Sequence, residues 1–244
     1  MKDTQSQRDH RNIPLQEAGV TSLSYPISIL DRSSSLQRTV GDITMSVSLP
    51  HDYRGTHMSR FIEVLEESGC SFTGKTIQTI LKRLQNVLQA ESAAMTVRFP
   101  YFLTRSAPVT GAGAMMRYEC VFTGEARGPR HEFLLTVTVP VATLCPCSRE
   151  ISDNGAHNQR GYVTMDVRTK RLPDGTFEMV WIEELIDIAE ESASAPLYTL
   201  LKRTDEKHVT ETDWGNAVFA EDVVRKVAGR LMGDRRITEF SVRA

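Results

Sequence analysis

Apolar and polar residues alternate along several stretches of this chain, a pattern that predicts strands with one buried face. Two other stretches are rich in β-branched and aromatic residues, and the glycine-containing segment between them predicts a hairpin closed by an ordinary loop. The strands are expected at 42–49, 95–103, 116–123, 133–141, 162–168 and 236–242.

Apolar residues recur at helical spacing in the remaining ordered segments. Helices are expected at 58–68, 73–89, 181–192, 196–202 and about 217–232. The resulting order is strand, two helices, two strands, then two strands, helices and a strand. It predicts an α+β fold of two tandem modules, 22–127 and 128–244, each an antiparallel sheet with helices on one face. Residues 1–21 are charged and lack a period, which predicts a mobile N-terminal arm.

Composition restricts the class of protein. The 244 residues are 40% hydrophobic, enough for a sizeable core, and 29 basic against 31 acidic residues give a formal net charge of -2. No block of like charge points to nucleic acid, and no apolar run approaches the length of a membrane span. With a polar start and four cysteines that form no disulfide framework, we expect a cytoplasmic protein that binds neither nucleic acid nor membrane.

The segment 145–160, CPCSREISDNGAHNQR, is the most informative stretch. A connection of this length without structure of its own is uncommon and usually functional. Pro146 favours extended geometry at Cys145, so that Cys145 and Cys147 face the same way, and Gly155 permits a reversal that brings His157 beside a thiolate. No second pair of closely spaced ligands exists, which excludes a zinc-finger pattern. The alternative is a polar hairpin loop with two inert thiols.

Carboxylates that could complete a metal site occur further along the chain. Glu190 and Glu191 precede a Ser/Ala break, and Glu206 follows the basic pair Lys202 and Arg203. Thiolate, imidazole and carboxylate together suit a borderline divalent metal, and three protein ligands leave one position open for water. The alternative is that all three glutamates are solvated charges on helix faces.

Three segments together resemble the prokaryotic type IB GTP cyclohydrolases. They are LCPCSREISDNGAHNQRGYV at 144–163, GTHMSRF at 55–61 and LYTLLKRTDEKHVTE at 197–211. The resemblance implies the tunnelling fold (T-fold), whose modules pair around a central barrel in a homotetramer with active sites at subunit interfaces. It also implies hydrolytic opening of the imidazole ring of GTP, giving formate and 7,8-dihydroneopterin triphosphate, at the start of folate and deazaguanine (queuosine) biosynthesis.

The resemblance also implies roles for individual residues. Cys147 and His157 become catalytic residues and, with Glu191, ligands of a divalent cation such as Zn²⁺, Mn²⁺ or Fe²⁺. For Cys145 a packing role in the loop is favoured, and a second thiol near the metal is the alternative. Glu206 becomes the residue that holds guanine, because an ionised glutamate can accept hydrogen bonds from the purine N1 and amino donors.

The triphosphate of GTP requires cationic partners, and the candidates are Lys202, Arg203, Arg160 and Arg60. For each of them, ordinary surface charge is the alternative. His57 is expected either to contact phosphate and shuttle protons or simply to cap the helix that follows it.

One departure from the family pattern bears on the function. The family continues past the last strand with an acidic and histidine-rich segment that resembles ESIHNH, and this sequence does not contain it. Histidines there could transfer protons or bind metal. This departure favours one alternative to a cyclohydrolase, a non-catalytic purine or pterin binder. A second alternative, independent of it, is a nitrile reductase for a deazaguanine, in which a cysteine attacks the substrate covalently.

Overall fold

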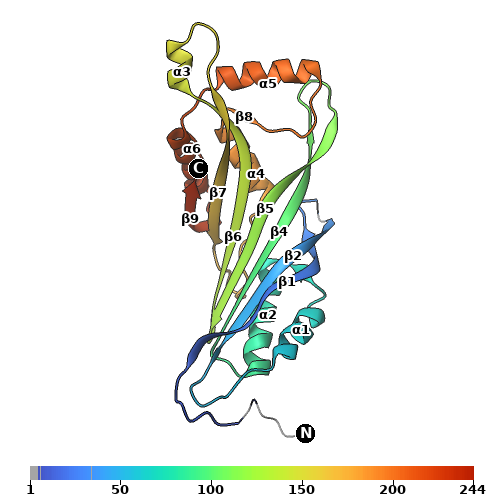
Figure 1. The fold of residues 1–244 in the computed structure, drawn as a ribbon, viewed down its shortest axis with the longest axis vertical. Coiled ribbons are helices and arrows are strands. Elements are labelled where there is room, and N and C mark those ends of the chain that lie inside the picture. Colours follow the sequence, from blue (N-terminus) through green and yellow to red (C-terminus); the bar gives the residue numbers. More distant parts are fainter. Residues whose placement is uncertain (1–4, 6, 34) are drawn as a thin grey trace. The chain divides into compact units, whose positions relative to one another are not determined.

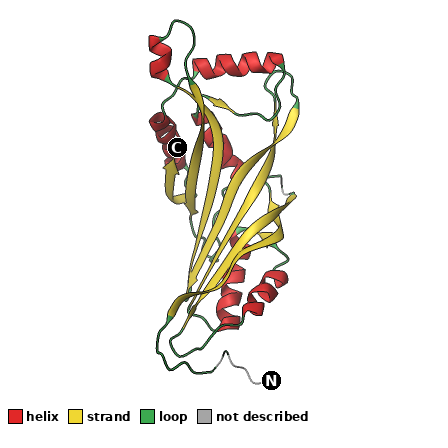
Figure 2. Ribbon diagram, viewed as in Figure 1, coloured by secondary structure: helices red, strands yellow, loops and turns green. Residues whose placement is uncertain are grey.

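The structure is a computed structural model that describes residue 5 and residues 7–33 and 35–244, and it has an α+β fold (Figures 1 and 2). The strands in these residues are β1 (Leu15–Leu30), β2 (Leu36–Leu49), β3 (Ser71–Phe72), β4 (Ser92–Ser106), β5 (Gly113–Arg127), β6 (Arg130–Leu144), β7 (Asn158–Thr169), β8 (Ala195–Pro196) and β9 (Ile237–Arg243). The helices are α1 (Met58–Glu67), α2 (Gly74–Leu88), α3 (Pro146–Ile151), α4 (Ile182–Ser192), α5 (Arg203–Gly215) and α6 (Ala220–Gly233).

The strands form one sheet in the order β3-β1-β2-β4-β5-β6-β7-β9, and β8 pairs with β6. β1 pairs antiparallel with β2, β2 with β4, and β7 with β9, whereas the short β3 lies parallel to β1. The predicted α+β class with a mainly antiparallel sheet is therefore confirmed. The tandem modules and the central barrel stay predictions.

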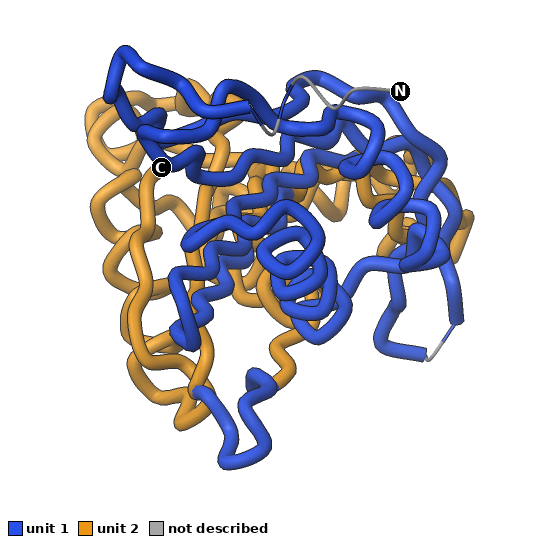
Figure 3. Tube along the Cα trace, turned by 90° about the horizontal axis from the view of Figure 1, so that it is seen from below, with its two compact units in different colours: residues 1–99, 121–135, 171–178 blue, residues 100–120, 136–170, 179–244 orange. Residues whose placement is uncertain are grey.

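The chain divides into two compact units, which Figure 3 colours separately. Unit 1 comprises residues 1–99, 121–135 and 171–178, and unit 2 comprises residues 100–120, 136–170 and 179–244. The long strands β4, β5 and β6 each contribute residues to both units. The predicted modules 22–127 and 128–244 stay a prediction.

In unit 1, α1 and α2 pack against each other and against β1 and β2 because each helix has one apolar stripe. Phe61 and Leu65 are fully buried on α1. Thr73 and Thr76 form a capping box that starts α2. A Cβ atom on Gly124 of β5 would overlap the side chain of Ile77, so glycine is needed where α2 approaches the strand.

In unit 2, the strands β6 and β7 alternate between a buried and a solvent-facing side, as their sequences predicted. Val137 and Val139 of β6 and Val163 of β7 are fully buried, whereas Thr138 faces the other side and hydrogen-bonds Thr164. α4 packs against α6, and α6 packs against β9. This core forms the scaffold that carries the connection between β6 and β7.

Two sequence predictions differ from the structure. The predicted helix at 196–202 is wrong: Ala195 and Pro196 pair with β6, and the hydroxyl of Thr199 donates to the carbonyl oxygen of Met115. Proline cannot donate a backbone hydrogen bond, and the chain becomes helical only at Arg203, where α5 begins.

The second difference concerns residues 1–21. We expected an unstructured arm throughout, but β1 begins at Leu15 and pairs with β2. Residues 1–4 and 6 lie outside the described residues, so the arm is not tested there. The helices expected at 58–68, 73–89, 181–192 and 217–232 are confirmed to within a few residues. Within the described residues, no helix has the length and apolar character needed to cross a membrane.

Candidate active site

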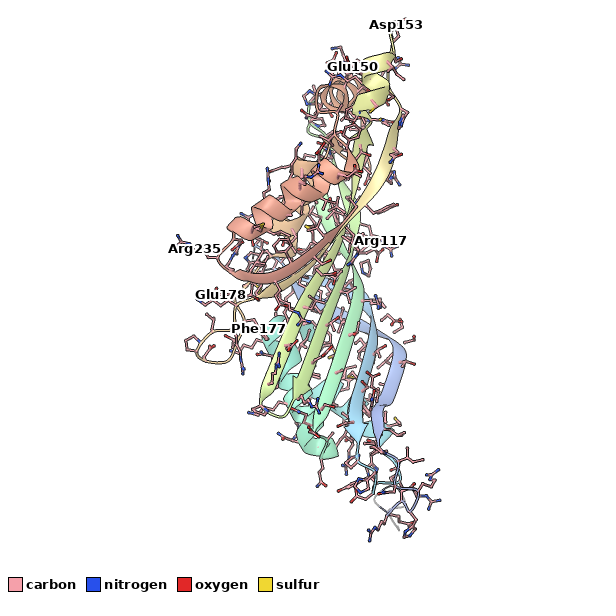
Figure 4. All side chains as sticks on the ribbon, turned by 90° about the vertical axis from the view of Figure 1, so that its left-hand side faces the viewer. Arg117, Glu150, Asp153, Phe177, Glu178 and Arg235 are labelled. Atoms are coloured by element: carbon pink, nitrogen blue, oxygen red, sulfur yellow. The ribbon has the colours of Figure 1, made fainter. Side chains whose placement is uncertain are left out.

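The connection between β6 and β7 in unit 2 is a closed loop, here called the signature loop (residues 145–157). The backbone N–H of Cys145 donates to the carbonyl oxygen of His157 at 3.1 Å. The backbone N–H of His157 in turn donates to Ser148 Oγ at 3.1 Å. α3 occupies the first half of the loop, and Figure 4 shows Glu150 and Asp153 at its tip. The backbones of Cys145 and His157 are therefore in contact at the base of the loop, while the pairing of Cys147 with His157 stays a prediction.

The two thiols of the signature loop differ in environment. Cys145 is partly buried and Cys147 is exposed. Hydrogen bonding from the backbone N–H of Ser148 lowers the pKa of Cys145, because it stabilises the thiolate form. From the sequence, packing was favoured for Cys145 over its alternative as a second thiol near the metal, and the lowered pKa supports that alternative. A signal existed: Pro146 at the first helical position indicates that Cys145 precedes a helix N-terminus.

The last turn of α5 holds the signature loop in two places. Arg149 on α3 donates to the carbonyl oxygen of Trp214 at 2.7 Å, and its guanidinium lies 5.3 Å from the centre of the Trp214 ring. Asn158, the first residue of β7, donates from Nδ2 to Asp213 Oδ2 at 3.1 Å. The last turn of α5 is thus bonded to α3 within the loop and to the residue that directly follows the loop.

The first turn of α5 is held by a fully buried carboxylate, Asp205. Its oxygens accept from the backbone N–H groups of Val109, Thr110 and Lys202 at 2.9 Å and from the hydroxyl of Thr110 at 2.7 Å. Burial alone would raise the pKa of Asp205, but these hydrogen bonds outweigh it and hold the pKa well below its ordinary value.

Three of the predicted substrate residues lie at this same end of α5. Lys202 is the N-cap residue, and Arg203 and Glu206 belong to the first turn. All three side chains are exposed. A helix N-terminus with two cations beside it favours anions, which suits a phosphate group. The structure therefore brings Lys202, Arg203 and Glu206 together, with Asp205 fixing the turn that carries them.

The predicted third ligand, Glu191, lies in the last turn of α4. Its carboxylate forms an ion pair with Arg230 of α6, and its side chain is 62% exposed. Within the described residues, no three His, Cys, Asp or Glu side chains are gathered closely enough to hold a metal ion. The structure pairs Glu191 with Arg230 rather than with the signature loop, and its role as ligand stays a prediction.

The neighbouring Glu190 is buried. It forms an ion pair with Arg105 at 2.6 Å and accepts from the hydroxyl of Tyr118 at 2.8 Å. Burial raises the pKa of Glu190, although Arg105 and Tyr118 partly oppose the shift. Burial and the negative charge of Glu190 raise the pKa of Tyr118 well above its ordinary value. Arg105, Tyr118 and Glu190 therefore form a polar network at α4 in which both carboxylate oxygens of Glu190 have a partner.

Arg160 lines a groove of about 540 Å³ in unit 2. Tyr162, Tyr198 and Thr199 also line it, together with Arg117, which is paired with Glu119 at 2.6 Å. Arginine and tyrosine side chains can contact phosphates and purine rings, so this groove is compatible with the predicted role of Arg160.

The remaining predicted residues, His57 and Arg60, lie in unit 1. His57 is the N-cap residue of α1, and its side chain makes no capping hydrogen bond. Arg60 donates to the carbonyl oxygen of Val87 at 2.7 Å. The role of both residues in binding phosphate stays a prediction.

Comparison with known sequences identifies the family. Residues 1–244 match the family described as Type I GTP cyclohydrolase folE2. The chain belongs to this family. It is 47% identical over 242 residues to the GTP cyclohydrolase FolE2 of Kosmotoga olearia, covering 99% of this chain and 91% of that protein. It is 50% identical to the FolE2 of Fervidobacterium nodosum, covering 99% and 90%.

Among solved structures, the chain is similar to a uricase from Arthrobacter globiformis, with a TM-score of 0.52 at 8% identity, over 93% of this chain and 79% of that one. At this identity the likeness concerns the fold alone. Membership of the FolE2 family confirms the prediction that the protein is a GTP cyclohydrolase, a hydrolase of folate biosynthesis with GTP as substrate.

Proposed function

We propose that this FolE2 family member opens the imidazole ring of GTP hydrolytically, with a divalent metal held at the signature loop, and yields formate and 7,8-dihydroneopterin triphosphate. The observation that carries the proposal is the closure of the loop, in which the backbones of Cys145 and His157 are hydrogen-bonded to each other. The whole-length relationship to proteins named GTP cyclohydrolase FolE2 supports the reaction.

The donors on the signature loop fit a borderline cation such as Zn²⁺, Mn²⁺ or Fe²⁺. His157 and a thiol would hold it: Cys147 is the residue predicted from the sequence, and Cys145 is the thiol with the lowered pKa. A bound cation of this kind acts as a Lewis acid and makes water more acidic. Glu191 is the proposed third ligand, and it would have to exchange its ion pair with Arg230 for the cation.

Substrate recognition is proposed for the first turn of α5. Glu206 would accept hydrogen bonds from the N1 and amino donors of guanine, since an ionised carboxylate is a pure acceptor. Lys202 and Arg203 would neutralise part of the triphosphate, assisted by the N-terminus of the helix. Arg160, His57 and Arg60 are proposed as further phosphate contacts.

The assembly is proposed to be a homotetramer of the type IB class, in which T-fold modules surround a central barrel and active sites lie at subunit interfaces. The uricase-like fold supports the T-fold assignment. Glu191 is paired with Arg230 rather than with the signature loop. This is compatible with a metal site that needs a residue from a second subunit.

The proposal is tested by incubating the purified protein with GTP and measuring formate, before and after treatment with a chelator and with added Zn²⁺ or Mn²⁺. We expect formate release that the chelator abolishes and metal restores. The variants Cys145→Ala and Cys147→Ala identify the thiolate, because only the ligand variant should lose tightly bound metal. Binding of GTP without formate under every metal condition would contradict the proposal, and a requirement for NADPH would indicate reductase chemistry instead.

A further inference from the structure

We propose that Asp213 is a positioning residue that directs His157 by holding Asn158. The inference rests on the proposed function of the signature loop and adds a residue to it. Asp213 lies in the last turn of α5, is 4% exposed, and accepts from Asn158 Nδ2 at 3.1 Å. Asn158 directly follows His157 and begins β7.

Adjacency in the chain links the two residues. His157 directly precedes the first residue of β7, so a tether on the Asn158 side chain restricts the orientation of the peptide that joins the two residues. The backbone of His157 is already hydrogen-bonded to Cys145 and to Ser148. With the tether in place, the imidazole retains only its own side-chain rotations. Without it, the backbone hydrogen bonds of His157 remain, but the side chain of Asn158 no longer fixes the start of β7 to α5.

A second contact from the same helical turn strengthens this interpretation. Trp214, next to Asp213, receives the guanidinium of Arg149 from α3. The last turn of α5 therefore contacts two places: Arg149, which lies two residues after Cys147, and Asn158, which directly follows His157. Such outer contacts orient ligands and commonly affect metal affinity by about 10-fold to 100-fold.

The two carboxylate oxygens of Asp213 lie in different environments. Asp213 Oδ1 is buried and has no hydrogen-bond partner within the described residues. A buried carboxylate with one donor is unfavourable, because its charge loses water without full compensation. Asparagine at this position would still accept from Asn158 and would remove the charge. The bond and the charge can therefore be separated by mutation.

The test compares Asp213→Asn, Asp213→Ala and Asn158→Ala in the full chain. Co²⁺ affinity is measured from its visible absorption, and the alkylation rates of Cys145 and Cys147 are measured by mass spectrometry on metal-free protein. We expect Asp213→Ala and Asn158→Ala to weaken Co²⁺ binding about 10-fold to 100-fold and to accelerate alkylation, whereas Asp213→Asn stays within about threefold of the original protein. Glu211→Gln removes an exposed carboxylate from the same helix and should change neither measurement.

Unchanged Co²⁺ affinity and alkylation in both alanine variants would overturn the proposal, as would equal damage by Asp213→Asn and Asp213→Ala. If Asp213→Ala does not fold, Asn158→Ala decides alone, because it keeps the carboxylate and removes only the bond. The alkylation rates do not depend on GTP. An original protein that releases no formate would therefore contradict the proposed reaction while leaving the positioning test intact.

Discussion

The carboxylate of Asp205 receives both the backbone N–H and the hydroxyl of Thr110, so a single buried side chain joins the β4–β5 turn to the start of α5. A bond of this kind depends on ionisation. Because the hydrogen bonds favour the charged form, the pKa of Asp205 in the folded protein lies below its unfolded value. The stabilisation is therefore complete above the unfolded pKa of about 3.9 and is lost as the pH falls toward the folded pKa.

The first prediction concerns Asp205→Asn. This variant should unfold at a lower temperature than the original protein at pH 7, because the amide cannot accept all four hydrogen bonds. The difference in Tm should begin to shrink as the pH falls below about 4, because the unfolded chain of the original protein then takes up a proton at Asp205 while the folded protein keeps this carboxylate ionised. The difference in Tm between the two proteins is measured by thermal unfolding, monitored by circular dichroism, from pH 7 to pH 3. A difference that stays constant over this range would show that ionisation of Asp205 does not contribute.

The second prediction concerns the polar network under α4. Glu190→Gln removes the buried carboxylate that pairs with Arg105 at 2.6 Å and leaves Arg105 only the more exposed Asp187 at 3.1 Å, and we expect a loss of about 3 kcal/mol in the free energy of unfolding. Tyr118→Phe removes only a hydroxyl and should cost less, about 1–3 kcal/mol. Urea unfolding of both variants measures these values. The idea fails if Tyr118→Phe proves the more damaging of the two.

The third prediction uses two glycines in different surroundings. Gly124→Ala should destabilise by about 1–3 kcal/mol, because the added methyl group overlaps Ile77 and lies 3.0 Å from Leu81 Cδ1. Gly229→Ala, within α6, adds a methyl group that meets no atom within 4 Å and should stabilise by about 0.4–1 kcal/mol. Denaturant midpoints of the two variants should therefore move in opposite directions, and movement in the same direction would contradict the packing argument.

The fourth prediction separates the proposed metal role of Glu191 from its observed ion pair. Either Glu191→Gln or Arg230→Ala breaks the exposed pair, and each should cost less than about 1 kcal/mol of stability. If Glu191 is a ligand, only Glu191→Gln should lose metal and formate release, whereas Arg230→Ala should keep both. Metal content after dialysis and a formate assay provide the comparison. Full metal occupancy in Glu191→Gln would remove this residue from the ligand set.

The sequence predicted those elements whose burial follows a simple period. The central residues of β6 and β7 alternate between buried and less buried positions, and α1 and α2 carry apolar stripes, so these elements could be assigned before the structure was known. β1 was not predicted, because only Ile27 and Ile29 of its residues are buried and a Pro lies beside them.

α5 was missed for a related physical reason. Its buried residues are the two aspartates Asp205 and Asp213, so it has no apolar stripe for a periodicity argument to find. It is held by hydrogen bonds to segments that are distant in the sequence. The lowered pKa of Cys145 was only partly visible in the sequence: Pro146 indicates a helix start, but the direction of the backbone N–H groups that bond the thiolate is set by the fold.

The two buried aspartates of α5 have a consequence for how this region tolerates change. They lie eight positions apart, about 12 Å along a helix axis, and each bonds a different part of unit 2. Apart from Glu206, the proposed guanine-binding residue, exposed positions between them can be exchanged as long as the helix persists. Inserting or deleting one residue would rotate one carboxylate by about 100° away from its partner. The number of residues between Asp205 and Asp213 is therefore constrained more strongly than the identity of the exposed residues between them.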